Sequence, residues 1–416
     1  MNILVIGNGF DLAHGLPTKY TDFLNFIKLF ADCYEKARNE QMDWCYFDTR
    51  NKVNAFLKKW FSSYYENENG QSKEEKEITI NTIKEFKTNI EDNIWIEYFI
   101  NNSMYKKENW IDFENEISKV IKSLDDDMHG LNETYSLDDE ITTLSNDFLR
   151  ERYSEYTFTV QQINMLNGKK ESESITFKEI RDILLNDLNR LIRALEIYLC
   201  EFVEKIEPQK KSPDIDGLDI DFILSFNYTH TFSKLYIELS VSKQEADNPF
   251  DYIHGKANIN NSIESNNMVL GIDEYLPEDR KNKDIEFIAF KKHYQRIYKQ
   301  TGCKYKKWVE SIQKDTEKKN MWLYDNQDHS KDHCHNLYIF GHSLDITDKD
   351  ILRDLILNDN VYTTIFYHDK DTMGQQIANL VKVIGQDELI RRTGGSTKTI
   401  EFKLQQDMVP IKQEDS

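Results

Sequence analysis

An asparagine and a histidine that follow strand-like apolar runs are the residues of this sequence best suited to chemistry. Asn227 follows the run Phe222–Phe226, and His254 closes the run Tyr252–His254. An asparagine amide can orient a water molecule, and a histidine, which titrates near neutrality when unperturbed, can take a proton from a hydroxyl group. Two simpler interpretations stay open. Asn227 could cap a helix that begins near Thr229, and His254 could be a satisfied turn residue.

A glycine-rich turn follows the first apolar run of the chain. Ile3–Ile6 has the pattern of a strand buried on both faces of a parallel sheet, and Gly7 and Gly9 come soon after it. Such a turn brings backbone N–H groups close to a pyrophosphate at the start of a helix. Leu12 stands where the dehydrogenase fingerprint has its third glycine, and no strand with an acidic ribose ligand follows about twenty residues later. Hydride transfer is therefore disfavoured, and a turn that only connects a strand to a helix remains the alternative.

Two further groups of polar residues have chemically useful types. His329 and the run His333–His335, which contains Cys334, could ligate a metal, but no matching second pair stands elsewhere and we expect no metal. Asp112 and Glu114 alternate at the start of a helical pattern, so one of them could face a site. Helix capping or a salt bridge is at least as good an interpretation of this pair.

The composition is that of a globular protein that repels polyanions. The 416 residues include 53 Lys and Arg against 73 Asp and Glu, a net charge of −20, so neither nucleic acid nor an anionic membrane surface is an expected partner. Five scattered cysteines contain no C-x-x-C pair and are expected to be reduced core thiols. The N-terminal apolar run stops at Gly7, far short of a signal peptide or a membrane span, so we expect a cytoplasmic protein.

Strand-like runs stand at both ends of the chain, with a long helical stretch between them. After Ile3–Ile6 the runs are Phe222–Phe226, Tyr252–His254, Met268–Ile272, Leu337–Phe340 and Thr363–Tyr367. Helical spacing is found in Val53–Leu57, Trp110–Ile121 and Phe177–Ile206. We therefore predict an α/β fold with a doubly wound, mostly parallel sheet of Rossmann type. Residues 1–30 and 215–405 would form it, with a large helical insertion at 31–214 and a polar tail at 406–416.

The motifs and their order resemble a known family. The opening Gly7-x-Gly9-x5-Gly15-x-Pro17 is similar to the opening of sirtuin-like NAD-binding domains, and later segments follow in the same order. Over residues 1 to about 405 the chain resembles the bacterial abortive-infection AbiH family of phage-defence proteins. The segments that carry this resemblance are Ile6–Thr18, Trp110–Glu114, Ser225–Thr229, Ile253–Gly255 and Gly341–Leu344.

The resemblance implies a sirtuin-like domain with NAD as its substrate, in an antiviral effector that hydrolyses NAD to nicotinamide and ADP-ribose. It implies that Asn227 orients the water or the ribose and that His254 is the base. The residues implied to hold the nucleotide are Gly7, Asn8, Gly9, Phe10, Asp11, Gly15, Pro17, Gly341 and Ser343. Thr229 and the segment Thr18–Tyr20 depart from the sirtuin pattern, and the zinc ribbon of the deacylases is missing, so hydrolysis is favoured over deacylation.

Two alternatives from other functional classes remain open. A sensor that binds a nucleotide without cleaving it would share the glycine turn, and an interaction scaffold would use the helical insertion. Each alternative is compatible with a phage-derived or protein trigger and with a homo-oligomer, and the sequence identifies neither of these.

Overall fold

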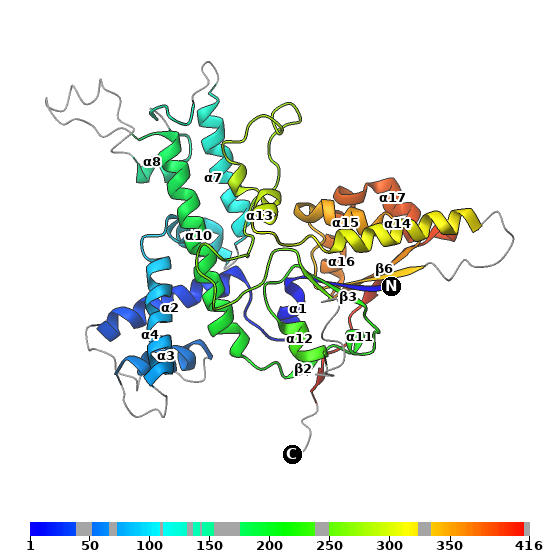
Figure 1. Ribbon diagram of the computed structural model, residues 1–416, viewed down its shortest axis with the longest axis horizontal. Coiled ribbons are helices and arrows are strands. Elements are labelled where there is room, and N and C mark those ends of the chain that lie inside the picture. The colour runs from blue at the N-terminus through cyan, green and yellow to red at the C-terminus, as the bar shows by residue number, and fades with distance from the viewer. Residues whose placement is uncertain are drawn as a thin grey trace. The chain divides into compact units, whose positions relative to one another are not determined.

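The computed structural model describes residues 1–38, 52–65, 73–108, 111–130, 136–141, 144–153, 175–237, 249–322 and 334–411. The chain divides into two compact units (Figure 1). The first unit consists of Met1–Lys19, Leu199–Asn258 and Lys299–Ser416, and it contains the sheet. The second unit consists of Tyr20–Tyr198 and Ile259–Tyr298, and it is mainly helical.

Within the described residues, six parallel strands form the sheet of the first unit. They are β1 (Asn2–Ile6), β3 (Phe222–Ser225), β4 (Phe250–Tyr252), β5 (His335–Phe340), β6 (Val361–Tyr367) and β7 (Ile400–Leu404). Their order in space is β4-β3-β1-β5-β6-β7. The chain therefore runs outward from β1 to one edge of the sheet, returns to β5 at the centre, and runs to the other edge. In such a sheet the carboxyl ends of the two central strands flank a crevice.

The mostly parallel α/β sheet predicted from the apolar runs is confirmed, with differences in individual strands. The pair β2 (Lys210–Lys211) and β8 (Val409–Pro410) adds a short antiparallel ribbon. The predicted strand Met268–Ile272 is wrong, because this buried run belongs to the second unit and the N–H of Leu270 bonds the side chain of Gln295 rather than a neighbouring strand. β4 ends at Tyr252, two residues before the predicted end, so His254 lies in a loop.

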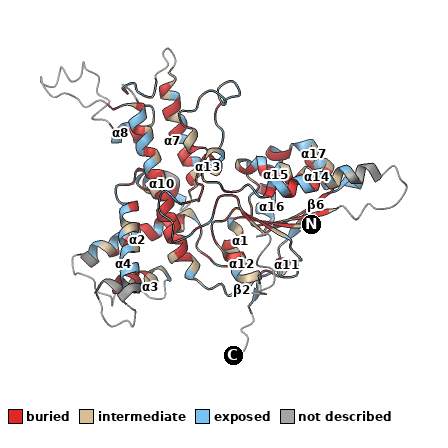
Figure 2. Ribbon diagram, in the orientation of Figure 1, coloured by how far each residue is buried: buried red, intermediate tan, exposed pale blue. Residues whose placement is uncertain are grey.

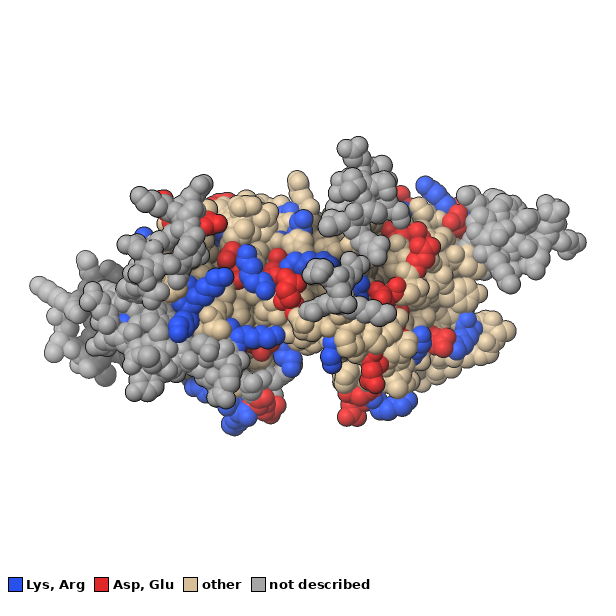
Figure 3. Space-filling model, turned by 90° about the horizontal axis from the view of Figure 1, so that it is seen from below, with Lys and Arg blue, Asp and Glu red and all other residues tan. Residues whose placement is uncertain are grey.

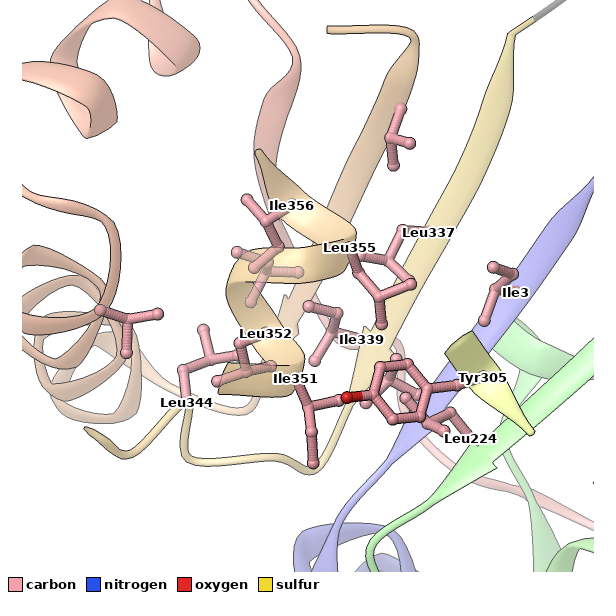
Figure 4. Packing of buried hydrophobic residues seen from close by; sticks show 14 of the residues in the cluster. Ile3, Leu224, Tyr305, Leu337, Ile339, Leu344, Ile351, Leu352, Leu355 and Ile356 are labelled. Atoms are coloured by element: carbon pink, nitrogen blue, oxygen red, sulfur yellow. The ribbon is translucent and has the colours of Figure 1, made fainter. Parts of the chain in front are cut away.

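Helices cover both faces of the sheet. The helices of this unit are α1 (Asn8–Ala13), η2 (Val203–Lys205), α11 (Pro213–Asp216), α12 (Thr231–Tyr236), α14 (Tyr305–Trp322), η5 (Ile346–Asp348), α15 (Lys349–Ile356), α16 (Lys370–Ile384), α17 (Gln386–Thr393) and η6 (Gly395–Thr397). Side chains of α14, α15, α16 and α17 belong to one apolar cluster with the strands, and side chains of α1, α11 and α12 belong to a second cluster. Figure 4 shows α15 packed against the face of the sheet that belongs to the first cluster.

The strand residues alternate between these two clusters. Ile3 and Val5 of β1 belong to the cluster of α14–α17, whereas Leu4 and Ile6 belong to that of α1 and α12. All of these side chains are at most 3% exposed, and Figure 2 shows buried residues, coloured red, in the sheet. A strand buried on both faces needs apolar residues at every position, which is why the run contains no polar residue after Asn2.

The second unit is built from helices, with bounds as follows: α2 (Tyr20–Arg38), α3 (Lys52–Tyr65), α4 (Lys73–Ile90), α5 (Ile94–Asn101), α6 (Ser103–Glu108), α7 (Phe113–Met128), α8 (Asp147–Arg152), α10 (Phe177–Glu201), η4 (Ile288–Phe290) and α13 (Lys292–Tyr298). The helices predicted around Val53–Leu57, from Trp110 and from Phe177 are α3, α7 and α10, although Trp110 itself lies outside the described residues. Arg193 and Glu196 of α10 form a buried ion pair at 2.6 Å that also bonds Asn261, so residues beyond β4 pack with these helices.

Candidate functional site

Four loops leave the sheet at the carboxyl ends of β1, β3, β4 and β5. The strand register sets Ile6 beside Ser225 and beside Phe340, and it sets Ser225 beside Tyr252, so these strands end at the same level. After β1 only Gly7 precedes α1, and the other three loops contain residues 226–230, 253–255 and 341–344. The residues implied by the sequence lie on these loops, on α1 or in the turn after α1.

Gly9 and Gly341 pack backbone against backbone where the two central loops meet. The N–H of Gly9 donates to the carbonyl oxygen of Gly341 across 2.8 Å. A Cβ on Gly9 would lie 2.8 Å from that same oxygen, and a Cβ on Gly341, which has a φ of +68°, would overlap the backbone nitrogen of Phe10. Only glycine allows this approach, so the turn after β1 is shaped by the loop after β5.

The same packing uses N–H groups that were expected to face a pyrophosphate. Gly7 donates to the carbonyl of Phe340 at 3.2 Å, and Phe10 donates to the carbonyl of Gly7 at 2.8 Å. Together with the bond from Gly9 to Gly341, these contacts satisfy three donors of the turn. A phosphate could take the donors of Gly7 and Gly9 only by breaking bonds between the loops after β1 and β5.

The remaining residues implied to hold a nucleotide differ in exposure. Asn8 is exposed, and its Oδ1 accepts a hydrogen bond from the Thr18 hydroxyl at 2.6 Å. Ser343 is also exposed, whereas Pro17 is half-buried. Gly15 has a φ of +75° in the turn after α1, a conformation that favours glycine. Asn8 and Ser343 are therefore polar side chains that a ligand at the two central loops can reach.

Asp11 is a buried carboxyl group on α1. It is 1% exposed, and its Oδ2 accepts a hydrogen bond from the hydroxyl of Thr229 at 2.7 Å. Its Oδ1 is buried without a hydrogen-bond partner among the described residues. Burial, partly opposed by hydrogen bonds from Thr229 and Thr231, raises the pKa of Asp11 from 3.8 to about 6. Phe10, the preceding residue, is fully buried in the apolar cluster and acts as a core residue.

Asn227 ties the loop after β3 to the turn after β1. Its Nδ2 donates to the carbonyl oxygen of Gly7 at 2.9 Å, and its backbone N–H donates to Oγ of Ser225 at 3.1 Å. The following helix, α12, begins at Thr231 with His230 at its N-cap position, so the interpretation of Asn227 as the cap of that helix is wrong. Asn227 thus has a structural hydrogen bond that its sequence position does not predict.

An aspartate that the sequence analysis missed lies between two histidines. Asp348, at the end of η5, has its Oδ1 3.4 Å from Nε2 of His254 and its Oδ2 3.4 Å from Nε2 of His342. The ring of Phe226 contacts both imidazoles edge-on, with centroids 5.5 Å and 4.3 Å away. All four residues are buried. The loops after β3, β4 and β5 therefore meet at one cluster that contains two imidazoles and a carboxyl group.

Helix α16 holds the loop after β5 in place. Gln376 donates from Nε2 to the carbonyl of His342 at 3.2 Å, and Asn379 donates from Nδ2 to the carbonyl of Ser343 at 2.9 Å. Leu344 has a φ of +59°, which is unusual for a residue with a side chain. Because two buried amides fix its carbonyls, this loop keeps the strained conformation that directs His342 toward Asp348.

A second polar cluster surrounds Glu204, just after α10. Oε1 of Glu204 is 2.6 Å from Nδ1 of His230, in the loop after β3. Burial opposes ionisation of Glu204, but the contacts with His230 and Lys234 outweigh it and lower the pKa. Burial, together with the charges of Glu204 and Asp11, raises the pKa of Tyr252 to about 12, so this phenol stays protonated at neutral pH.

His14 has a structural role in the same unit. Its Nδ1 donates to the carbonyl of Phe10 at 2.7 Å, which leaves Nε2 to accept from the hydroxyl of Tyr236 at 2.8 Å. The Tyr236 oxygen accepts in turn from the N–H of Ser212 at 2.7 Å. Burial lowers the pKa of His14, and the hydrogen bond to Phe10 only partly opposes it, so the ring is neutral in this chain of bonds.

The polar pair at the start of α7 does not belong to this cluster of loops. Asp112 is the N-cap of α7, where it accepts from the N–H of Asn115 at 3.2 Å. Glu114 forms an ion pair with the buried Lys292 at 2.8 Å in the second unit. Capping and a salt bridge, the simpler interpretations of this pair, are therefore confirmed.

Other sequence expectations concern metal ions and membranes. His329 and His333 lie outside the described residues, whereas His335 is buried on β5 with Nε2 3.3 Å from Asp315. The part of the chain that the structure describes holds no group of three or more ligand side chains arranged for a metal ion. In that same part, no helix is both long enough and apolar enough to cross a membrane.

Comparison with known proteins gives one family. A family model described as Bacteriophage abortive infection AbiH matches residues 3–368, which is most of the chain and includes the loops after β1, β3, β4 and β5. No curated protein and no solved structure matches the chain.

Proposed function

Because the chain belongs to the bacteriophage abortive infection AbiH family, we propose that it acts in phage defence by hydrolysing NAD to nicotinamide and ADP-ribose. Family membership supports the role in abortive infection. The choice of NAD rests on the sirtuin-like order of the motifs and on the sheet that presents them.

The strand order is the observation that carries the proposal. Numbered along the chain, the six parallel strands lie in the order 3-2-1-4-5-6, which is the order of doubly wound sheets that bind dinucleotides. In those sheets the ligand lies at the carboxyl ends of the two central strands, here β1 and β5. The glycine turn, Asn227 and the pair His254 and His342 all follow strands at this edge.

The contacts of the turn after β1 limit how NAD would be held. Since the N–H groups of Gly7, Gly9 and Phe10 already donate within the chain, we expect side chains to supply the polar contacts to the pyrophosphate. Asn8, the first residue of α1, and Ser343, in the loop after β5, are both exposed, so they suit that role. The half-buried Gly9 then shapes the site without touching the nucleotide.

Hydrolysis needs few groups once NAD is held. A water oxygen bonds C1′ of the ribose, the C1′–N1 bond breaks, and nicotinamide leaves as a neutral molecule with the electron pair. The reaction passes through an oxocarbenium-like state and releases one proton. We assign to His254 the removal of a proton from a ribose hydroxyl or from the water, and to Asn227 the orientation of the water or the ribose.

On the face of the molecule drawn in Figure 3, Lys and Arg side chains lie among Asp and Glu side chains rather than in one continuous basic field. The chain also has a net charge of −20. Both features favour a small anionic substrate at a local site over a nucleic acid that needs many phosphate contacts.

The test is to incubate the purified full chain with NAD, separate the products by chromatography, and measure the thermal shift that NAD causes. The proposal predicts equal amounts of nicotinamide and ADP-ribose, together with a rise in melting temperature, because a ligand that binds the native state stabilises it. A thermal shift without cleavage under any activating condition would replace the hydrolase with a nucleotide sensor. Neither cleavage nor a shift would favour an interaction scaffold.

A further inference from the structure

Asp348 does not cap the helix that it precedes. It occupies the N-cap position of α15, where an aspartate usually accepts from a backbone N–H, yet its side chain makes no capping hydrogen bond. Asp345, three residues earlier, does accept such a bond, from the N–H of Thr347 at 3.1 Å. The carboxyl group of Asp348 instead lies 3.4 Å from Nε2 of both His254 and His342.

The tautomer of His342 is fixed by its own loop. The N–H of Leu344 donates to Nδ1 of His342 at 2.9 Å, so Nδ1 is an acceptor and carries no proton. In the neutral ring the proton is therefore on Nε2, the atom that faces Oδ2 of Asp348. Oδ2 of Asp348 therefore lies opposite the Nε2 proton of His342, and Oδ1 of Asp348 lies opposite Nε2 of His254.

We propose that Asp348 is a positioning residue that holds the proton of His254 on Nε2 and so keeps the buried Nδ1 unprotonated. A carboxylate that accepts from one imidazole nitrogen fixes the ring in the corresponding tautomer. His342 anchors the carboxylate from its other side, and the ring of Phe226 contacts both imidazoles. The benefit to catalysis rests on the proposed function, whereas the tautomer of His254 does not depend on any substrate.

The arrangement makes a definite prediction for Asp348→Asn. The amide has one acceptor and one donor in place of two acceptors. Because Leu344 holds His342 with its proton on Nε2, the amide oxygen must stay with His342. The NH₂ group then faces Nε2 of His254. This nitrogen can accept a hydrogen bond from the NH₂ group only if it carries no proton. We therefore expect His254 to change to the tautomer with its proton on Nδ1.

The experiment is nitrogen NMR of the full-length protein labelled with ring-¹⁵N histidine, recorded without substrate. The chain has ten histidines, and single variants His254→Gln and His342→Gln assign the two resonance sets. The expected wild-type pattern is a protonated Nε2 and an unprotonated Nδ1 in both rings. In Asp348→Asn the pattern of His254 should invert and that of His342 should persist. Asp345→Asn is the matched control, because its side chain caps η5 and should leave both patterns unchanged.

Two results would overturn the inference. One is a wild-type His254 with its proton on Nδ1, which needs no variant and so remains decisive even if Asp348→Asn fails to fold. The other is a folded Asp348→Asn protein in which His254 keeps its wild-type pattern. If wild-type protein cleaves NAD, Asp348→Asn should lower turnover by about 10²- to 10⁴-fold with little change in KM. A protein that cleaves no NAD but shows the tautomer switch would refute the proposed function and leave this inference intact.

Discussion

The side-chain amide of Asn227 donates to the carbonyl oxygen of Gly7 across 2.9 Å, and this bond joins the loop after β3 to the turn after β1. Both residues are buried, and the Gly7 oxygen also accepts from the N–H of Phe10 at 2.8 Å. Asn227 therefore supports the geometry of the turn even before any substrate is considered. Its proposed role in orienting a water or a ribose depends on the same anchored side chain.

Replacing Asn227 by alanine should lower the free energy of unfolding by about 0.5–1.5 kcal/mol, because the buried carbonyl of Gly7 loses one of its two hydrogen bonds and keeps the one from the N–H of Phe10. Urea unfolding followed by circular dichroism measures the difference from the wild type. Asn8→Ala is the control, since Asn8 is exposed and its loss should change stability by less than about 0.5 kcal/mol. Equal stability of both variants would mean that the Gly7 bond does not support the fold.

Gly9 and Gly374 offer a matched pair of glycines. A Cβ on Gly9 would lie 2.8 Å from backbone atoms of Gly341, which cannot move without disturbing the sheet, so Gly9→Ala should destabilise the protein by about 2 kcal/mol or more. Gly374 is exposed in the middle of α16 with no atom within 4 Å of an added Cβ, so Gly374→Ala should stabilise it by about 0.5–1 kcal/mol. Thermal unfolding of both variants shows whether the melting temperature falls for Gly9→Ala and rises for Gly374→Ala. A Gly9→Ala protein as stable as the wild type would restore the view that Gly9 serves the ligand alone.

Asp11 should make stability fall as the pH rises toward neutrality. Its pKa in the folded chain is about 6 against an ordinary 3.8, so the folded state holds this proton more tightly than the unfolded state. The protonated Asp11 stabilises the folded chain fully at a pH below 3.8, its ordinary pKa. This stabilisation is lost as the pH rises through about 6, its pKa in the folded chain. The gap between the two values corresponds to roughly 3 kcal/mol. Asp11→Asn keeps the shape of the side chain without the charge, so its stability relative to wild type should increase from about pH 4 to about pH 7.

Asp369 provides a control of opposite sign for this measurement. Hydrogen bonds from Thr372 lower the pKa of Asp369 to about 2 at the start of α16. The ionised Asp369 stabilises the folded chain at a pH above 3.8, its ordinary pKa, and this stabilisation is lost only as the pH falls toward about 2. The difference in unfolding free energy between Asp369→Asn and wild type should therefore stay level from about pH 4 to about pH 7. Urea unfolding at four pH values gives both differences. If the difference in unfolding free energy between Asp11→Asn and wild type also stays constant over this pH range, Asp11 does not hold its proton more tightly in the folded chain.

The sequence allowed the prediction of the central strands because each is an apolar run bounded by a turn. β7 was missed although Ile400–Leu404 alternates apolar with charged residues, because five alternating residues at the edge of a sheet give a weaker signal than a continuous apolar run. Met268–Ile272 has the composition of a buried strand, but composition does not distinguish pairing with strands from burial against the helix that contains Gln295. Which partner buries a run is decided by tertiary contacts that its own residues do not encode.

The site was predictable in part, for a similar reason. His254 and Asn227 follow strands of one parallel sheet, and that placement alone brings them to the same edge. Asp348 stands before a helix, where an aspartate is usually a cap, so its position in the sequence suggested no other role. The glycines Gly7 and Gly9 were expected to make room for a phosphate. In the structure they pack instead against Gly341 and its neighbours, more than 330 positions later in the chain, and no local pattern specifies that contact.

The last prediction concerns turnover of NAD. His254→Ala should reduce it by roughly 10²-fold or more, the scale expected for the loss of a positioned base. Asn227→Ala should cause a loss of the same order, with the additional loss of stability described above. The measurement is NAD cleavage by purified protein at a temperature well below the midpoint of the less stable variant, so that unfolding does not contribute. His368→Ala is the control, because this histidine is exposed, with 78% of its side chain accessible, and should retain parental turnover.

The thermal shift separates the two ways in which a variant can lose activity. An inactive His254→Ala protein that NAD still stabilises has lost chemistry, because binding to the native state alone raises the melting temperature. An inactive variant without the shift has lost binding, which would assign His254 to the pocket rather than to proton transfer. The loss at His254 should also exceed that at Asn227 once stability is controlled, because only the imidazole is assigned a proton in the reaction. Parental cleavage by both variants would remove these two residues from the mechanism.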